Sequence, residues 1–371
     1  MTRTRTLVVA GLGMVVLVVA AASVAARPSP SPNLPPISPE GLVTSTLRAL
    51  ARDRPVSGHL TAHLDLGLPA LPDVAPGPVG TDAASFLASL SGDHRLRLWS
   101  SPDGFRLAEL RRASERAIFV SRTDAWAWDF DSFTAYHLGR FPQGIGSPGH
   151  HGTGSMLDLV DPLAWTRKAL DAITPTTRVS AGETTRVAGR DAYVLALEPR
   201  TAETLVRRIE IDIDAERRLP LRVAVYSRAR RAAPISVGFT SISFDDIDPS
   251  TFRFTPPPGA TVRDISREFA DGKGRKGQGI EGSSRDAYGP GEDNQGAPVR
   301  LFGDDWATIV ALRTPPPADL RRSGEEFDPT SLLPLSGPLL SVRLVERGDH
   351  AWLVYGLVPQ ASLAAASREL P

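Results

Sequence analysis

Residues 191–225 read DAYVLALEPRTAETLVRRIEIDIDAERRLPLRVAV, and this stretch decides the fold class. Large apolar residues stand at every second position in three runs: Tyr193/Leu195/Leu197, Ile209/Ile211/Ile213 and Leu221/Val223/Val225. Successive side chains of a strand point to opposite faces. Each run therefore predicts a strand with one apolar face.

The same alternation extends towards the N-terminus, in Leu60/Ala62/Leu64/Leu66, Leu96/Leu98, Phe105/Leu107 and Trp126/Trp128/Phe130. Seven or more such strands, most with polar residues between the apolar ones, predict an antiparallel sheet with one solvated side. Short turns at residues 102–104 (PDG) and 188–191 (AGRD) indicate hairpin connections.

Two helices are expected beside this sheet. Ser38-Pro39-Glu40 is a typical helix start, and apolar residues repeat at helical spacing as far as Arg52. Asp161-Pro162 begins a second helix, which contains Trp165 and Leu170. Two helices cover little of a sheet of about ten strands, so the sheet must curl on itself or receive the helices on its apolar face.

The chain divides into five parts. Residues 1–26 have a basic start and an apolar run that ends in small residues, which is typical of a signal peptide; an uncleaved membrane anchor is the alternative. Either reading places the protein outside the cytoplasm. A proline-rich spacer (27–37), the large sheet domain (38–270) and a glycine-rich flexible linker (271–297) follow. Residues 298–371 are expected to form a small α+β domain, with strands at 306–312 and 339–358 and a helix from Gln360.

Composition excludes several classes of function. The 371 residues include 42 basic and 42 acidic side chains and no cysteine. A zero net charge argues against a nucleic-acid binder, and the absence of cysteine excludes disulfides and thiolate chemistry. Only Lys168, Lys273 and Lys276 are lysine, so 42 − 3 = 39 basic residues are arginine. This bias is typical of a GC-rich bacterial genome.

The histidines do not form a metal-ligand pattern. His59 and His63 lie on an expected strand, where four residues span about 13 Å, too far for one ion. His150-His151 stand in a glycine-rich loop without a spaced third ligand.

Other short motifs also lack a catalytic pattern. Residues 152–155 (GTGS) do not complete a nucleophile elbow, and Asp245, Asp246 and Asp248 lack calcium-loop spacing. Residues 228–231 (RARR) suit a solvated hairpin end or a contact with anionic headgroups. We therefore expect no catalytic residue, no metal, no cofactor and no enzymatic activity.

The apolar face of the sheet is the remaining candidate site. It is either ordinary core or, where the helices leave it uncovered, a pocket for acyl chains or other apolar ligands. The candidate lining residues are Leu64, Leu66, Leu96, Leu98, Trp126, Trp128, Phe130, Trp165, Leu170, Leu195, Leu197, Ile211 and Ile213.

Several motifs resemble a known family. Val56-Ser57-Gly58 opens the first strand, VAGRDAYVL (187–195) forms a hairpin, and FRFTPPPGA (252–260) is similar to the end of the lipoprotein-carrier domain of LolA, LolB and RseB/MucB. WLVYGLVP (352–359), followed by an alanine-rich helix, resembles the second domain of RseB/MucB. The resemblance implies an unclosed antiparallel β half-barrel with helices in its concave face and an apolar cavity for lipoprotein acyl chains.

Three functions remain open from the sequence. The leading one is an exported lipid- or lipoprotein-binding protein. The family resemblance implies either lipoprotein transport or envelope-stress sensing through a membrane-bound anti-sigma factor. The membrane surface is expected as a further partner. The second is a structural or partner-binding envelope protein whose half-barrel is filled by its own side chains. The third is a cell-wall or glycan-processing enzyme, which requires a convergent carboxylate pair or triad.

Overall fold

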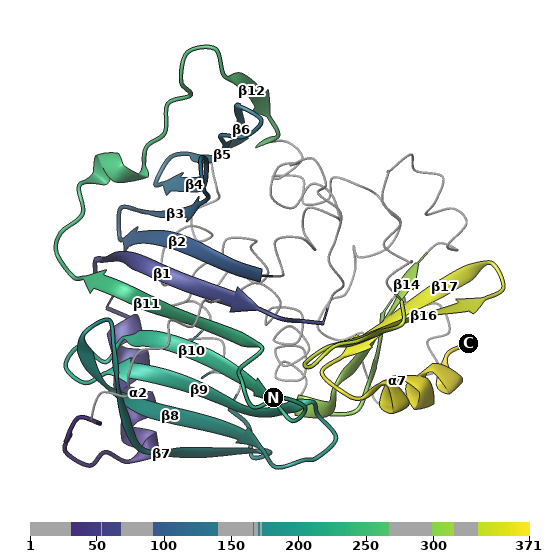
Figure 1. Ribbon diagram of the computed structural model, residues 1–371. Helices are drawn as coiled ribbons and strands as arrows, with labels where there is room; N and C mark the ends of the chain where they lie inside the picture. The colour runs from purple at the N-terminus through teal and green to yellow at the C-terminus, as the bar shows by residue number, and fades with distance from the viewer. Residues whose placement is uncertain are drawn as a thin grey trace.

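The computed structural model describes residues 31–52, 54–67, 92–139, 166, 170, 173–266, 299–314 and 333–371. These residues form two sheets with few helices (Figure 1). The strands of the larger sheet are β1 (Val56–Leu64), β2 (Gly92–Ser101), β3 (Gly104–Leu110), β4 (Glu115–Ser121), β5 (Ala125–Asp129), β6 (Thr134–Gly139), β7 (Thr177–Val187), β8 (Arg190–Pro199), β9 (Val206–Asp214), β10 (Pro220–Ser227), β11 (Ile235–Ser243) and β12 (Thr261–Asp264).

The larger sheet has the order β12-β6-β5-β4-β3-β2-β1-β11-β10-β9-β8-β7. All neighbouring strands pair antiparallel except β12 and β6, which are parallel. Within the described strands, the two ends of the sheet, β12 and β7, do not pair with each other. The predicted unclosed, antiparallel sheet is confirmed.

Local sequence explains the hairpins. The turn between β7 and β8 places Ala188 at φ 52° and Gly189 at φ 76°. Two consecutive positive φ angles make a tight hairpin turn whose twist matches that of the strands, and glycine adopts such angles without strain. The predicted turn at residues 102–104 likewise joins β2 to β3.

Helix α2 (Pro39–Leu50) begins as predicted, because the Ser38 hydroxyl accepts a hydrogen bond from the Gly41 amide at 3.0 Å. Its buried side chains are Leu42, Thr46, Ala49 and Leu50. Leu42 packs with residues of β8 and β9, and Leu50 packs with residues of β1 and β2. We call the side of the sheet that α2 contacts the inner face and the opposite side the outer face.

The smaller sheet has the order β13-β14-β17-β16-β15. Its strands are β13 (Val299–Phe302), β14 (Ile309–Thr314), β15 (Leu335–Ser336), β16 (Ser341–Arg347) and β17 (His350–Gly356). Helix α7 (Gln360–Ala366) covers one side through Leu363 and Ala366, which pack on Trp352 and Val354 (Figure 1). Short 3-10 turns complete the described elements: η3 (Pro249–Phe252), η4 (Asp305–Ala307) and η7 (Ser367–Glu369).

The two sheets are in direct contact. The Leu357 carbonyl accepts hydrogen bonds from the Leu205 amide at 2.7 Å and from the Thr204 hydroxyl at 2.8 Å. The Trp306 indole N–H donates to the Thr177 hydroxyl at 2.8 Å. We call the smaller sheet together with α7 the C-terminal unit. These hydrogen bonds attach it to the end of the larger sheet.

The smaller sheet confirms the predicted hairpin within 339–358 and the helix from Gln360. The predicted strand at 306–312 is wrong at its start, because Trp306 lies in η4 and β14 begins at Ile309. A turn there lets the Trp306 side chain leave the small sheet and pack against the large one.

The described end of the proline-rich spacer contacts the larger sheet. The Pro35 carbonyl accepts a hydrogen bond from the Tyr193 hydroxyl at 2.9 Å, and the Pro32 carbonyl accepts one from Thr184 at 2.8 Å. Leu34 and Ile37 pack against the core of the sheet. The end of the spacer is thus bound to β7 and β8.

Some predictions fall outside the described residues. These are the export segment 1–26, the start of the spacer, Trp165, the 150–155 loop and the linker 271–297. Of the predicted second helix, Thr166 and Leu170 are described in helical conformation, and both are buried. In the part of the chain that the structure describes, no helix has the length and hydropathy to cross a bilayer.

Candidate functional site

Two apolar rows cross the inner face from β7 to β1, following the strand register. The first row contains Ala181, Leu195, Ile211, Val223, Val237 and Ala62. The second contains Val179, Leu197, Ile209, Val225, Ile235 and Leu64. We call the segment of the inner face that is formed by β7, β8, β9 and β10 the covered half.

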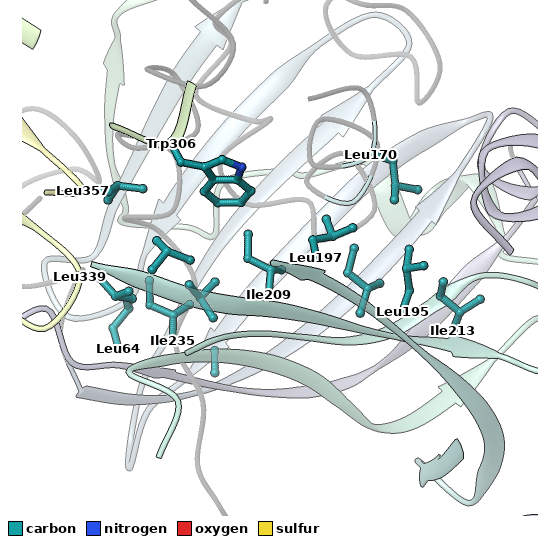
Figure 2. Packing of buried hydrophobic residues seen from close by; sticks show 14 of the residues in the cluster. Leu64, Leu170, Leu195, Leu197, Ile209, Ile213, Ile235, Trp306, Leu339 and Leu357 are labelled. Carbon is teal, nitrogen blue, oxygen red and sulfur yellow. The ribbon is translucent and has the colours of Figure 1, made fainter. Parts of the chain in front are cut away.

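Most side chains of the covered half are enclosed by the protein itself, although Val179, Ala181 and Val223 are half-buried. Leu195, Ile211 and Ile213 have no exposed surface. Side chains from α2, the spacer, the C-terminal unit and residue 170 cover them, among them Leu34, Ile37, Leu42, Leu170, Trp306, Leu339 and Leu357. Figure 2 shows Trp306 and Leu170 above Leu197 and Leu195. This region is hydrophobic core.

On the inner face from β2 to β6, which we call the open half, half-buried apolar side chains lie next to charged ones. One row runs through Leu98, Leu107, Ile118, Ala127 and Tyr136. Ile118 and Ala127 are half-buried, as is Leu96 on the neighbouring row. Apolar side chains at the centre of an inner face that retain exposed surface are the best candidates for contact with an apolar ligand.

A charged row borders the open half. Leu96 is in register with Glu109, Glu109 with Arg116, and Arg116 with Asp129, so these side chains share the inner face. Arg116 Nε lies 3.1 Å from Asp129 Oδ2, and His94 Nδ1 lies 2.6 Å from Glu109 Oε1.

The charges in this row are paired and little exposed. The side chains of Glu109, Arg116 and Asp129 are 23%, 13% and 6% exposed. Burial raises the pKa of the Glu109 carboxyl, but the hydrogen bond and charge of His94, together with Arg111 and Arg116, hold that pKa below its ordinary value. Glu109 is therefore a half-buried anion at neutral pH.

The open half thus offers apolar rows beside hydrogen-bonding charged groups. An amphipathic ligand suits such a surface, because its hydrocarbon part removes apolar side chains from water while its polar part reaches the charged row. The covered half also keeps half-buried apolar side chains at Val179, Ala181 and Val223, but the rest of its two rows belongs to the buried core.

Most of the predicted lining residues lie on the inner face. Leu64, Leu96, Leu98, Leu195, Leu197, Ile211 and Ile213 share it through the strand register. Leu66 and Leu170 belong to the same core cluster as Leu195. The structure divides the set, however, because only Leu96 remains half-buried and the others are buried.

Three predicted lining residues are misplaced. Trp126 and Trp128 lie on the outer face, where the Phe254 ring is 5.8 Å and 5.7 Å from theirs. Phe130 lies in the turn after β5 and is 49% exposed. Alternation places Trp126 and Trp128 on one face without saying which, and Ala127, between them, faces inward.

The sequence analysis missed the charged row. A signal for it exists, because Glu109 stands two residues after Leu107 and four after Phe105, on the same face of β3. A charged residue at an inward-facing position of this alternation marks where the inner face changes from apolar to charged.

The histidine and acidic candidates are engaged in local interactions. His63 lies on β1, with its Nδ1 2.9 Å from Asp93, and Asp248 caps η3 by accepting from the Ser250 amide at 2.8 Å. Among the described residues, no group of three or more His, Cys, Asp or Glu is placed to hold a metal ion.

No family model matches the chain, and no curated protein matches it in sequence. Among solved structures, the MucA/MucB complex of Pseudomonas aeruginosa has 14% identity and a TM-score of 0.42, covering 88% of this chain and 96% of that chain. The chain is similar to MucB over most of its length.

Two further structures match a smaller share. A putative outer membrane lipoprotein-sorting protein domain from Vibrio parahaemolyticus has 12% identity and a TM-score of 0.23, covering 58% of this chain and 97% of that chain. A LolA superfamily protein from Nitrosomonas europaea has 10% identity and a TM-score of 0.21, covering 59% and 99%.

Proposed function

We propose that this protein is an exported lipid- or lipoprotein-binding protein that holds an acyl chain on the open half of the inner face. One observation carries the proposal: Leu96, Ile118 and Ala127 are half-buried apolar side chains on the inner face and lie next to the charged row of Glu109, Arg116 and Asp129. The charged row next to them supports an amphipathic ligand rather than a purely apolar one.

Binding on this surface needs no covalent step. An acyl chain would pack on the open half, and burial of apolar surface contributes about 25 cal/mol per Å² before the cost of ordering the chain. The polar end of the ligand would accept or donate hydrogen bonds at Arg116 and Glu109. No residue in this step acts as an acid, base or nucleophile.

The biological role follows from the family resemblance. A carrier would deliver the bound lipoprotein, whereas a sensor would pass its occupancy to a membrane-bound anti-sigma factor. The presence of a C-terminal unit that resembles the second domain of RseB/MucB favours the sensor. The basic, apolar N-terminus supports an extracytoplasmic location for either role.

The test is extraction of purified full-length protein followed by lipid mass spectrometry. Ala127→Trp should fill the open half and lower the co-purifying lipid at least severalfold, because the indole occupies the space of the ligand. Thr240→Trp, on the exposed side of β11, is the matched control and should leave the lipid unchanged. Lipid bound by residues 1–26 is common to both variants and cancels in the comparison.

The second candidate is a partner-binding envelope protein with a filled half-barrel. The buried core of the covered half favours it, since Leu195, Ile211 and Ile213 have no exposed surface. This function predicts equal amounts of lipid in the wild type, Ala127→Trp and Thr240→Trp. That result would exclude acyl-chain binding on the open half.

A further inference from the structure

The exposed large apolar side chains of the described residues gather at one end of the larger sheet. They are Leu110, Phe130, Phe133 and Val262, which are 39%, 49%, 39% and 53% exposed. They come from the end of β3, the β5–β6 turn and β12, in the upper part of the sheet in Figure 1. We call these four residues the hydrophobic tip.

Backbone contacts join these residues into one surface. Leu110 is in register with Glu115, whose carbonyl accepts a hydrogen bond from the Phe130 amide at 3.2 Å. The rings of Phe130 and Phe133 are 6.4 Å apart. The Phe133 carbonyl accepts from the Thr261 amide at 3.0 Å, and Val262 follows directly. The three chain segments that carry the tip are therefore adjacent at this end of the sheet.

The hydrophobic tip has a firm base. The Asp129 carboxylate accepts from the Asp131 amide at 2.9 Å, and the Phe133 amide donates to the Phe130 carbonyl at 3.2 Å. The Phe133 ring stands edge-on to Trp128 at 5.4 Å. The turn that carries the exposed rings is thus held by hydrogen bonds. Less conformational entropy is therefore lost when the turn binds to a surface.

Two exposed arginines lie next to Leu110 of the tip. Arg95 is in register with Leu110, Arg112 follows two residues later, and both are exposed. Among the described residues, neither arginine lies within 4.0 Å of a carboxylate. The nearby acids Asp131 and Glu115 are each 3.1 Å from another arginine, Arg111 and Arg106.

We infer that the hydrophobic tip inserts into the surface of an anionic bilayer. Aromatic and aliphatic side chains on short turns can enter the headgroup region without exposing unpaired strand groups, and arginines beside them attract anionic headgroups. Phe130 directly follows Asp129 of the charged row, so insertion brings the bilayer to the border of the open half. The inference does not depend on whether that half holds lipid.

The test places an environment-sensitive fluorophore at the tip of the full-length chain. Because the chain has no cysteine, Ser132→Cys gives a single labelling site between Phe130 and Phe133. Thr123→Cys, in the turn between β4 and β5 at the opposite end of the strands, is the matched control. Each labelled protein is mixed with phosphatidylglycerol or phosphatidylcholine vesicles, and co-sedimentation measures attachment separately.

Insertion predicts a blue shift and protection from an aqueous quencher at position 132 with phosphatidylglycerol vesicles, and neither change at position 123. Replacing Phe130 and Val262 with serine should abolish the shift while circular dichroism stays unchanged. Arg95→Gln and Arg112→Gln should each lower the inserted fraction about fivefold. Arg122→Gln, at the other end of the strands, should not.

Two outcomes overturn the inference. One is an unchanged signal at position 132 on vesicles to which the protein is attached. The other is a blue shift that grows with protein concentration in the absence of vesicles, which would identify the tip as a contact between copies of the chain.

Discussion

The two halves of the inner face share the same alternating strand pattern but differ in the residues that border them. In the covered half, Leu195 and Ile211 are buried by α2, the spacer and the C-terminal unit. In the open half, Ile118 and Ala127 keep exposed surface, and a charged row crosses the strands beside them. The strand pattern is common to both halves, so the elements packed on the inner face, and not the strand sequence, decide which of its apolar side chains are fully buried.

The largest expected effect separates the halves by stability. Ile211→Ala should lower the free energy of unfolding by about 3 kcal/mol, because it leaves a cavity in an enclosed core. Ile118→Ala, in the open half, should cost about 1 kcal/mol, because its side chain is already partly hydrated. Urea denaturation measures both. Equal losses would remove the distinction between the halves.

The charged row provides the next test. Arg116→Met leaves the Asp129 carboxylate buried without its guanidinium partner and should lower the free energy of unfolding by about 2 kcal/mol. Arg122→Met is the control, since Arg122 pairs with Asp103 at the surface and should change stability by less than about 0.5 kcal/mol. A cost for Arg116→Met no larger than that of the control would show that the row is freely hydrated.

Glu109 makes the open half sensitive to acid. Its pKa is lower in the folded protein than the ordinary value of 4.5, so its ionised form stabilises the fold at higher pH. That stability is lost as the pH falls below 4.5 and through the folded-state pKa. Glu109→Gln should therefore lose less stability between pH 6 and 3 than the wild type. Parallel denaturation midpoints for the two proteins would contradict the assignment.

The smallest effect concerns the cover of the other half. Tyr193→Phe removes the hydrogen bond to the Pro35 carbonyl and should cost about 1 kcal/mol. Proteolysis near residues 31–37 should also become faster, because the spacer is held less firmly. Unchanged cleavage would mean that Leu34 and Ile37 hold the segment without this bond.

Sequence reasoning recovered the sheet and most of its inner face, because alternation, turn residues and helix caps are local signals. Local sequence does not decide which side chains of β5 point to the inner face. Trp126 and Trp128 are the larger residues, yet they face Phe254 on the outer side, and this contact joins positions far apart in the chain. The binding of the spacer to Tyr193 and of Trp306 to Thr177 escaped prediction for the same reason.

The Leu357 carbonyl accepts hydrogen bonds from both Leu205 and Thr204 and so links the smaller sheet to the larger one without a covalent bond. Leu357, Trp306 and Leu339 also fill part of the larger sheet's core. The peptide bonds between residues 266 and 299 are therefore not required to hold the two sheets together. A chain cut once in that interval should migrate as a single species under native conditions and separate into two fragments only when denatured.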